Sequence, residues 1–203
     1  MSAAASLFPL FLKLRHRKVV VVGGGPVAAS KLDALVPTGA DITVVAPEIH
    51  PHIRSLAVTI VVRPFSPSDL DGAWLVVAAA PPDVNKDVRA AGESRRVFVN
   101  AVDDPESASA FTGGVLRRGS VTIAVSTDGE APALAGLVRE GLETIVPDEI
   151  EEWVREARAL RRLQRAESIP LPDRRPLLLR ALNELYAGNR VGTRATPRAE
   201  AIP

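Results

Sequence analysis

The chain has 203 residues, of which 46% are hydrophobic and 24% charged, a balance typical of a globular rather than a disordered protein. Its net charge of +1 gives no field that would attract nucleic acid, and no apolar run approaches the ~20 residues needed to cross a bilayer. The absence of cysteine excludes disulfides, thiolate metal sites and cysteine nucleophiles, and it fits the cytoplasm, where we expect this protein to work.

The N-terminal segment Leu7–Leu14 is apolar but short, and it runs directly into the basic residues Arg15–Lys18. This pattern favours an extended segment laid on the first domain over a signal peptide.

The first hundred residues alternate between short β-branched runs and helical patterns. Val19–Val22 is a continuous apolar run, as expected for a strand buried on both faces of a parallel sheet. The other expected strands are Asp41–Ala46, Val58–Val62, Trp74–Ala79 and Val97–Ala101, and the expected helices are Val27–Leu35, Glu48–Leu56 and Asp83–Ala91. This order predicts an α/β fold with a Rossmann-type, doubly wound parallel sheet.

The pattern changes after residue 105. Ala110–Val115 and Ser120–Ser126 are strand-like with no helix between them, which predicts an antiparallel pair suited to dimerisation. Helices are expected at Ala133–Thr144, Asp148–Gln164 and Arg174–Tyr186. We therefore expect a Rossmann domain over residues 1–112, a small α+β dimerisation region over 113–146, a helical C-terminal region over 147–188 and a loose tail over 189–203.

A glycine-rich turn carries the strongest local signal. Gly23, Gly25 and Ala28 form a Gly-x-Gly-x-x-Ala motif directly after a buried strand and directly before a helix. Gly23 permits the tight turn, and Gly25 lets backbone approach a diphosphate, which would then rest on the free N–H groups of the helix. The alternative is a tight turn without a ligand.

Two further stretches belong to the same edge of the predicted sheet. Glu48 follows the second strand, where Rossmann sites carry the acid that binds the adenosine ribose, although it could equally be a first-turn residue of the next helix. No arginine stands at the end of that strand to meet a 2′-phosphate, which favours NAD over NADP. Ala80 lies in a stretch of small residues after the fourth strand, which is either a surface for the nicotinamide half or an ordinary loop.

Three blocks together resemble the precorrin-2 dehydrogenase/sirohydrochlorin ferrochelatase family, which includes the N-terminal module of siroheme synthase. The blocks are Leu10–Leu14 with Val19–Ala28, then Asn100–Asp103, then Val125–Pro132, and the likeness covers residues 5–165. The resemblance implies a Rossmann domain, a dimerisation region and a helical C-terminal part, assembled as a homodimer.

The resemblance also implies an activity. Members of the family oxidise precorrin-2 to sirohydrochlorin with NAD as the hydride acceptor, in siroheme or cobalamin biosynthesis, and some also insert Fe²⁺. Asp103 matches the catalytic aspartate, although on residues alone it could be a turn residue. Ser126 and Thr127 match a hydroxyl pair that lines the tetrapyrrole pocket. Asn100 belongs to the motif that presents Asp103, and we expect it to bind the substrate together with this pair. Ser126 could otherwise be a helix cap.

Four positions match family residues that contact the dinucleotide: Pro26, Val27, Pro47 and Glu48. The third block departs from the family pattern, since Asp128 replaces a glycine and Ala131 a serine. These changes leave open the choice of substrate and the chelatase step.

Two readings compete with the dehydrogenase. The chain could be a dehydrogenase of another small substrate, or an NAD-binding redox or ligand sensor without turnover. Arg117 and Arg118 are candidates for binding substrate carboxylates, with a solvated turn as the alternative. His50 and His52 could chelate a metal, but no other residue with ligand spacing lies nearby, so we expect an exposed loop and no metal site.

Overall fold

The structure is a computed structural model that describes residues 7–102, 104 and 108–192, with side chains of the last helix described up to residue 185. It divides into two compact units. The first holds Met1–Gly114 with Val125–Gly136, and the second holds Val115–Ala124 with Leu137–Pro203. Within the described residues, no helix is both long and apolar enough to span a membrane.

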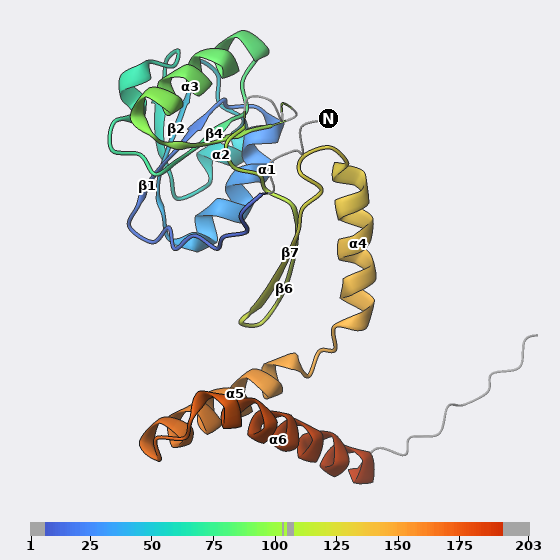
Figure 1. Cartoon of the computed structure of the whole chain (residues 1–203). Helices are drawn as coiled ribbons and strands as arrows, with labels where there is room; N and C mark the ends of the chain where they lie inside the picture. The colour runs from blue at the N-terminus through green and yellow to red at the C-terminus, as the bar shows by residue number, and fades with distance from the viewer. Residues whose placement is uncertain (1–6, 103, 105–107, 193–203) are drawn as a thin grey trace, which may run out of the picture. The chain divides into compact units, whose positions relative to one another are not determined.

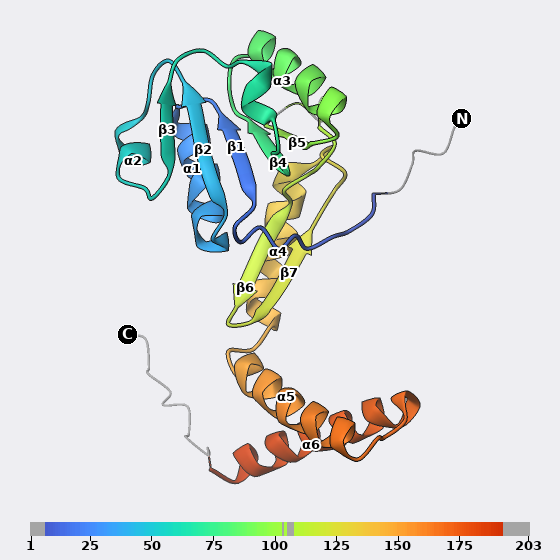
Figure 2. The same cartoon turned by 90° about the vertical axis from the view of Figure 1, so that its left-hand side faces the viewer.

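A parallel five-stranded sheet is the centre of the first unit (Figure 2). Its strands are β1 (Lys18–Val22), β2 (Asp41–Ala46), β3 (Thr59–Val62), β4 (Leu75–Ala78) and β5 (Phe98–Ala101). They lie in the order β3-β2-β1-β4-β5, and every pairing is parallel. The strand order reverses between β1 and β4, the point at which doubly wound sheets bind their ligands. The Rossmann-type fold expected from the sequence is confirmed.

Helices cover both faces of this sheet (Figure 1). The helical elements of the first unit are α1 (Pro26–Leu35), η1 (Val36–Thr38), α2 (Pro51–Arg54), η2 (Pro67–Leu70) and α3 (Pro82–Arg95). Alternate β1 residues face opposite ways, because side chains alternate along a strand. Val19 and Val21 pack with α1 and α2, whereas Val20 and Val22 pack with η2 and α3. The unbroken valine run is thus buried on both faces, as predicted.

Several predicted elements have different bounds in the structure, among them one helix of the first unit and the strand before Gly119. The helix expected over Glu48–Leu56 is only the four-residue α2, because Pro51 sets its first position and the His50 ring accepts the His52 N–H at 3.2 Å. The strand expected over Ala110–Val115 lies instead at β6 (Gly114–Arg118). The residues before it bond to β5, since Ser109 and Ala110 both donate their N–H to the Val99 carbonyl, at 2.8 and 3.0 Å.

The chain then forms a two-stranded sheet and three helices. β6 pairs with β7 (Val121–Val125) through a turn at Gly119, whose φ is +52°. The helices are α4 (Pro132–Ile145), α5 (Ile150–Ala166) and α6 (Leu171–Gly192). Within the second unit, α5 and α6 are tied where the buried Gln164 amide donates to the Arg174 carbonyl at 3.3 Å. Helix α6 continues to Gly192, past residue 188, where the sequence analysis ended the helical region.

Candidate functional site

A pocket of about 660 Å³ opens at the carboxyl ends of the first unit's strands. We call it the strand-end pocket, and its lining comes from the turns after β1, β2, β3 and β4. It is lined by Val22, Gly23, Gly24, Gly25, Val45, Ala46, Pro47, Glu48, Ile49, His50, Pro64, Phe65, Ala79, Ala80, Pro81 and Val84. Most of these side chains are apolar or absent, so backbone groups supply much of the pocket's polarity.

The protein itself requires two of the three glycines of the turn. Gly23 has φ +122°, and a Cβ there would collide with the carbonyl oxygen of Ala79. A Cβ on Gly24 would collide with the carbonyl oxygen of Glu48, while the Gly24 carbonyl accepts the His50 N–H at 2.8 Å. These contacts lock the turn between the ends of β2 and β4.

Gly25 is different, because nothing in the described part of the chain requires a glycine there. Its φ of −84° and ψ of −173° are open to any residue, and a Cβ would meet no atom within 4 Å. The space is the strand-end pocket, which Gly25 lines. The missing side chain of Gly25 therefore leaves space in the pocket, and packing within the described protein does not require its absence. That arrangement fits a ligand that approaches the backbone closely.

Helix α1 begins at this turn with no side-chain cap among the described residues. Pro26 stands at its first position and carries no N–H, so the N–H groups of Val27 and Ala28 are the ones left open at the helix start. Pro26 and Val27 do not line the strand-end pocket. Open N–H groups and the dipole at a helix start favour the binding of anions such as a diphosphate.

The ribose-binding prediction falls on an exposed residue that lines the pocket. Glu48 lies in the bend between β2 and α2, three residues before the helix begins at Pro51. The alternative role in the first turn of α2 is therefore wrong, because the helix is shorter than predicted. Pro47 and Ala80 also line the pocket, and Ala80 is fixed by its N–H bond to the Asn85 side-chain oxygen at 3.1 Å.

The structure assigns roles here that the sequence analysis missed. Asn85 is 6% exposed and lies on the side of α3 that faces the sheet. In the sequence, only the presence of a polar residue at a core-facing position of the predicted helix could have indicated its role. His50 lines the pocket, and the His52 ring lies 2.8 Å from Asp33 on α1. Through their hydrogen bonds, the two histidines connect α2 to the glycine turn and to α1, and they do not lie in an open loop. The described residues contain no cluster of three metal-binding side chains.

An arginine also stands at this edge, although not on the strand that the sequence analysis considered. Arg63 follows β3, and β3 is in register with β2 so that Val62 is opposite Ala46. Arg63 and Pro47 are thus the residues that directly follow these two paired strands, at the edge where the ribose is expected. The Arg63 guanidinium binds Asp69 through two nitrogens, one of them at 2.9 Å.

The end of β5 is only partly described. Asn100 is 5% exposed, and its amide donates to the Ala110 carbonyl at 2.9 Å, so it anchors the segment that follows β5 and does not face an open pocket. Its side-chain oxygen has no partner among the described residues. Asp103 lies outside the described residues, so its proposed catalytic role stays a prediction.

Ser126 and Thr127 line a second pocket of about 250 Å³ in the first unit. We call it the hydroxyl pocket; it is lined by Phe111, Thr112, Gly113, Gly114, Ser126, Thr127, Gly129, Pro132, Ala135 and Gly136. The Ser126 oxygen accepts the Asp128 N–H at 3.2 Å, and the Thr127 oxygen accepts the Ala131 N–H at 3.3 Å. Thr127 therefore bonds the residue just before α4, whereas the Ser126 bond closes a turn four residues before the helix begins, so the helix-cap alternative for Ser126 is wrong.

A cation stands at the rim of the hydroxyl pocket. The Lys31 ammonium on α1 donates to the Thr112 hydroxyl at 3.2 Å. Arg118, by contrast, is a strand residue of the second unit, where it pairs with Asp148 and donates to the Glu143 carbonyl at 2.7 Å. Asp128 adopts φ +54°, a left-handed conformation that glycine adopts freely and aspartate tolerates.

Two family models match the chain. One, described as "Putative NAD(P)-binding", covers residues 10–114, and one described as "Sirohaem biosynthesis protein central" covers residues 118–144. The first alone spans more than half of the chain.

Proteins with similar sequences support the same family. "Siroheme synthase 3" of Aeromonas hydrophila is 36% identical over 91% of this chain, and "Siroheme synthase" of Salmonella arizonae is 39% identical over 82%. The chain spans only 40% and 38% of the length of these two relatives. Among solved structures, "SirC, precorrin-2 dehydrogenase" superposes with a TM-score of 0.66 at 22% identity, covering 86% of this chain and 88% of that one. The chain therefore belongs to the NAD(P)-binding family of siroheme synthases and precorrin-2 dehydrogenases that its three sequence blocks resemble.

Proposed function

We propose that this chain binds NAD in the strand-end pocket and oxidises precorrin-2 to sirohydrochlorin. Gly25 is the observation that carries the proposal, because it lines the pocket and has open space where a side chain would stand, which supports close approach of a ligand to its backbone. The start of α1 supplies N–H donors for a diphosphate, and Glu48 supplies an acceptor for ribose hydroxyls. The names of the relatives supply the substrate.

The reaction removes a hydride and a proton from precorrin-2. The nicotinamide of NAD supplies the hydride acceptor. The chain must orient the substrate and remove the proton, and the resemblance gives the second task to the Asp103 carboxylate. Asp103 comes two residues after Ala101, where β5 ends, so the chain leaves the sheet at the same edge as the glycine turn.

The substrate carries several carboxylates, and the hydroxyl pocket offers groups that suit them. Ser126 and Thr127 supply hydroxyl donors, and Lys31 brings a positive charge to Thr112 at the rim. This combination supports the proposal that one edge of the tetrapyrrole is held there. Asn100 acts in this proposal as an anchor for the segment that follows Asp103, because it is buried.

The test is turnover with a separate measurement of cofactor binding. Purified protein is mixed with precorrin-2 and NAD, and the absorbance of sirohydrochlorin and of reduced nicotinamide is followed. We expect turnover by the wild type, and loss of turnover with retained NAD affinity in Asp103→Ala. Asp41→Ala is the matched control, because this exposed acid begins β2 at the opposite edge of the sheet.

Each competing function gives a result in this assay that differs from the one expected for the proposed function. A sensor would bind NAD and leave precorrin-2 unchanged. A dehydrogenase of another substrate would bind NAD and fail with precorrin-2 alone. Absence of NAD binding would remove the proposal entirely.

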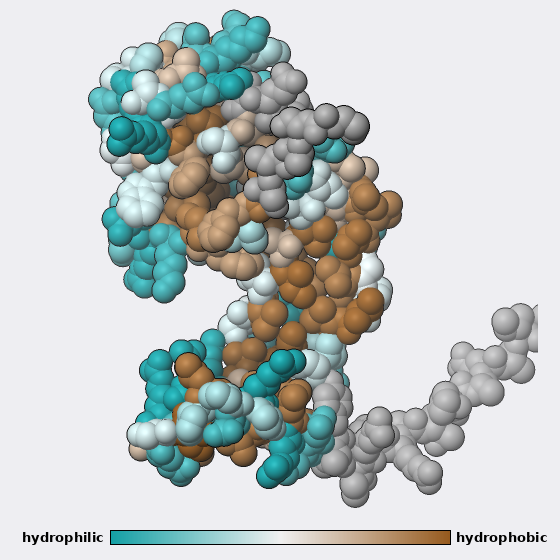
Figure 3. Space-filling view, viewed as in Figure 1, coloured by the Kyte–Doolittle hydropathy of each residue, from teal (hydrophilic) through white to brown (hydrophobic). Residues whose placement is uncertain are grey.

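The homodimer, with residues 113–146 as its dimerisation region, is proposed on a separate observation. Helix α4 exposes apolar side chains, and Figure 3 shows hydrophobic surface gathered over this helix. The exposed residues are Leu134, Leu137, Val138 and Ile145. We expect a dimer by light scattering, and a shift to monomer in Leu137→Glu.

Fe²⁺ insertion and a cytoplasmic location complete the proposal. The chelatase step rests on the family resemblance, and it is tested with sirohydrochlorin and Fe²⁺ against the rate without protein. The location rests on the cysteine-free sequence.

A further inference from the structure

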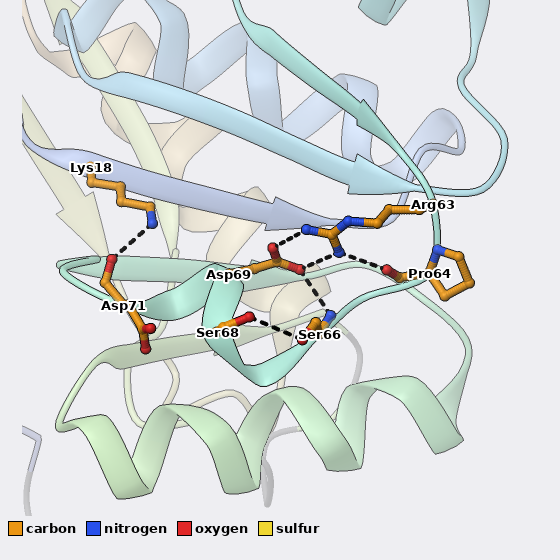
Figure 4. A network of polar contacts seen from close by, with 7 residues as sticks. All are labelled: Lys18, Arg63, Pro64, Ser66, Ser68, Asp69 and Asp71. Carbon is orange, nitrogen blue, oxygen red and sulfur yellow. Dashed lines mark hydrogen bonds and ion pairs between the residues drawn. The ribbon is translucent and has the colours of Figure 1, made fainter.

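A compact ion-pair network stands beside the strand-end pocket (Figure 4). Arg63 binds both oxygens of Asp69 and also donates to the Pro64 carbonyl at 2.9 Å. Asp69 in turn accepts the Ser66 N–H at 2.8 Å. The network therefore ties the end of β3 to η2.

This network lies where a Rossmann site distinguishes its two dinucleotides. The discrimination depends on the 2′ position of the adenosine ribose, which is a hydroxyl in NAD and a phosphate in NADP. Glu48 lies in the bend after β2, and Arg63 directly follows β3, whose last pair with β2 joins Val62 to Ala46. Pro64 and Phe65, the next two residues, line the pocket itself.

Asp69 already occupies the guanidinium of Arg63. The Asp69 side chain is 11% exposed and the Arg63 side chain 45%, so the acid is the fixed partner and the arginine the accessible one. The hydrogen bonds from Arg63 are the largest cause that lowers the pKa of Asp69 below its ordinary value, with the Ser66 N–H also contributing. The acid thus stays ionised and keeps its hold at neutral pH.

We propose that Asp69 is a positioning residue for cofactor choice, which holds Arg63 away from the ribose so that the site accepts NAD and disfavours NADP. A 2′-phosphate at this edge would meet the Glu48 carboxylate, while the nearby arginine is already paired. The inference rests on the proposed NAD site but adds a residue that never touches the cofactor.

The experiment compares the affinities of NAD and NADP for the full chain, by titration calorimetry, in four proteins. These are the wild type, Asp69→Asn, Arg63→Ala and the double variant. Asparagine keeps an oxygen for the Ser66 N–H, so the turn retains its bond, and a thermal melt checks the fold.

We expect the wild type to prefer NAD. In Asp69→Asn the affinity for NADP should rise about 2- to 5-fold, a gain typical of one exposed charge pair, while the NAD affinity is unchanged. The double variant should lose the gain, because the freed cation is gone. Arg63→Ala alone should leave the NADP affinity unchanged, and this result is informative even if Asp69→Asn does not fold.

The opposite results would overturn the inference. An unchanged NADP-to-NAD ratio in Asp69→Asn would show that Asp69 does not control the arginine. A gain that survives in the double variant would exclude Arg63 as its source, and a loss of NADP affinity in Arg63→Ala would mean that the arginine is not withheld. If the wild type binds neither nucleotide, the proposed function fails first.

Discussion

The two pockets of the first unit are lined by different kinds of chemical group. The strand-end pocket is lined largely by glycines and apolar side chains, so its ligand would be held by backbone groups and by shape. The hydroxyl pocket places two side-chain hydroxyls and a nearby lysine around a smaller cavity. Ligand binding to a pocket lined by backbone groups should change little when a polar side chain is removed, but it should weaken when a substitution adds atoms. In a pocket lined by polar side chains, each substitution should remove one contact with the ligand. Substitutions can test this difference directly.

Gly25→Asp should have the largest effect. Aspartate is a favoured residue at a helix N-cap, so α1 should keep or gain stability. Its carboxylate would project into the space that a diphosphate needs, and we expect NAD affinity to fall by about 100-fold or more, through steric and charge repulsion. Calorimetric titration measures the binding, and thermal unfolding measures the stability.

Gly23→Ala is the contrasting variant. Gly23 has φ +122° and faces the Ala79 carbonyl, so alanine there should lower the unfolding midpoint. Normal NAD affinity in Gly25→Asp would mean that the glycine turn holds no diphosphate.

The same difference explains what the sequence could predict. The strand-end pocket follows from local patterns: a valine run, a glycine turn and a helix start, all within Lys18–Leu35. The strand Asp41–Ala46 is also observed with its predicted bounds. Arg63 was missed because its position at this edge depends on the pairing of β2 with β3, and no local pattern contains that register.

The hydroxyl pocket was accessible only through the family resemblance. Its lining comes from two segments, residues 111–114 and 126–136, which the fold brings together. Lys31 lies far from both in sequence, so its bond to Thr112 had no sequence signal. The β6 strand was misplaced for a related reason, because the residues before Gly113 bond to β5 instead of continuing β6.

Thr127→Val should produce a smaller loss than Gly25→Asp and at a different step. Valine keeps the shape but removes the oxygen that lines the hydroxyl pocket and accepts the Ala131 N–H. We expect KM for precorrin-2 to rise about 3- to 10-fold, the size of one lost hydrogen bond, with NAD affinity unchanged. Steady-state kinetics with Thr127→Ser, which keeps the hydroxyl, is the control. Equal KM values for valine and serine would remove Thr127 from the substrate site.

Lys31→Ala should be weaker still. The lysine stands at the rim and is half-buried, so its attraction for a substrate carboxylate is partly screened by water. We expect KM for precorrin-2 to rise about 2- to 5-fold at low salt, and the difference from wild type to shrink at high salt. Lys86→Ala, an exposed lysine on α3, is the matched control. A salt-independent effect would point to packing instead of charge.

The last expected effect concerns the stability of the protein and comes from Asp69 beside the strand-end pocket. Its pKa is lowered in the folded protein, first by the Arg63 hydrogen bonds, so the ionised form is favoured by folding. A lowered pKa contributes stability above the unfolded value of about 3.9, and this contribution is lost as the pH falls through the folded pKa. Asp69→Asn should therefore cost about 1 kcal/mol of unfolding free energy at pH 7, and its difference from wild type should shrink below about pH 4. Denaturant titrations from pH 7 to pH 3 measure this difference, with Asp41→Asn as the exposed control. A gap that stays constant over this range would mean that the Asp69 hydrogen bonds, and not its charge, hold Arg63 at the end of β3.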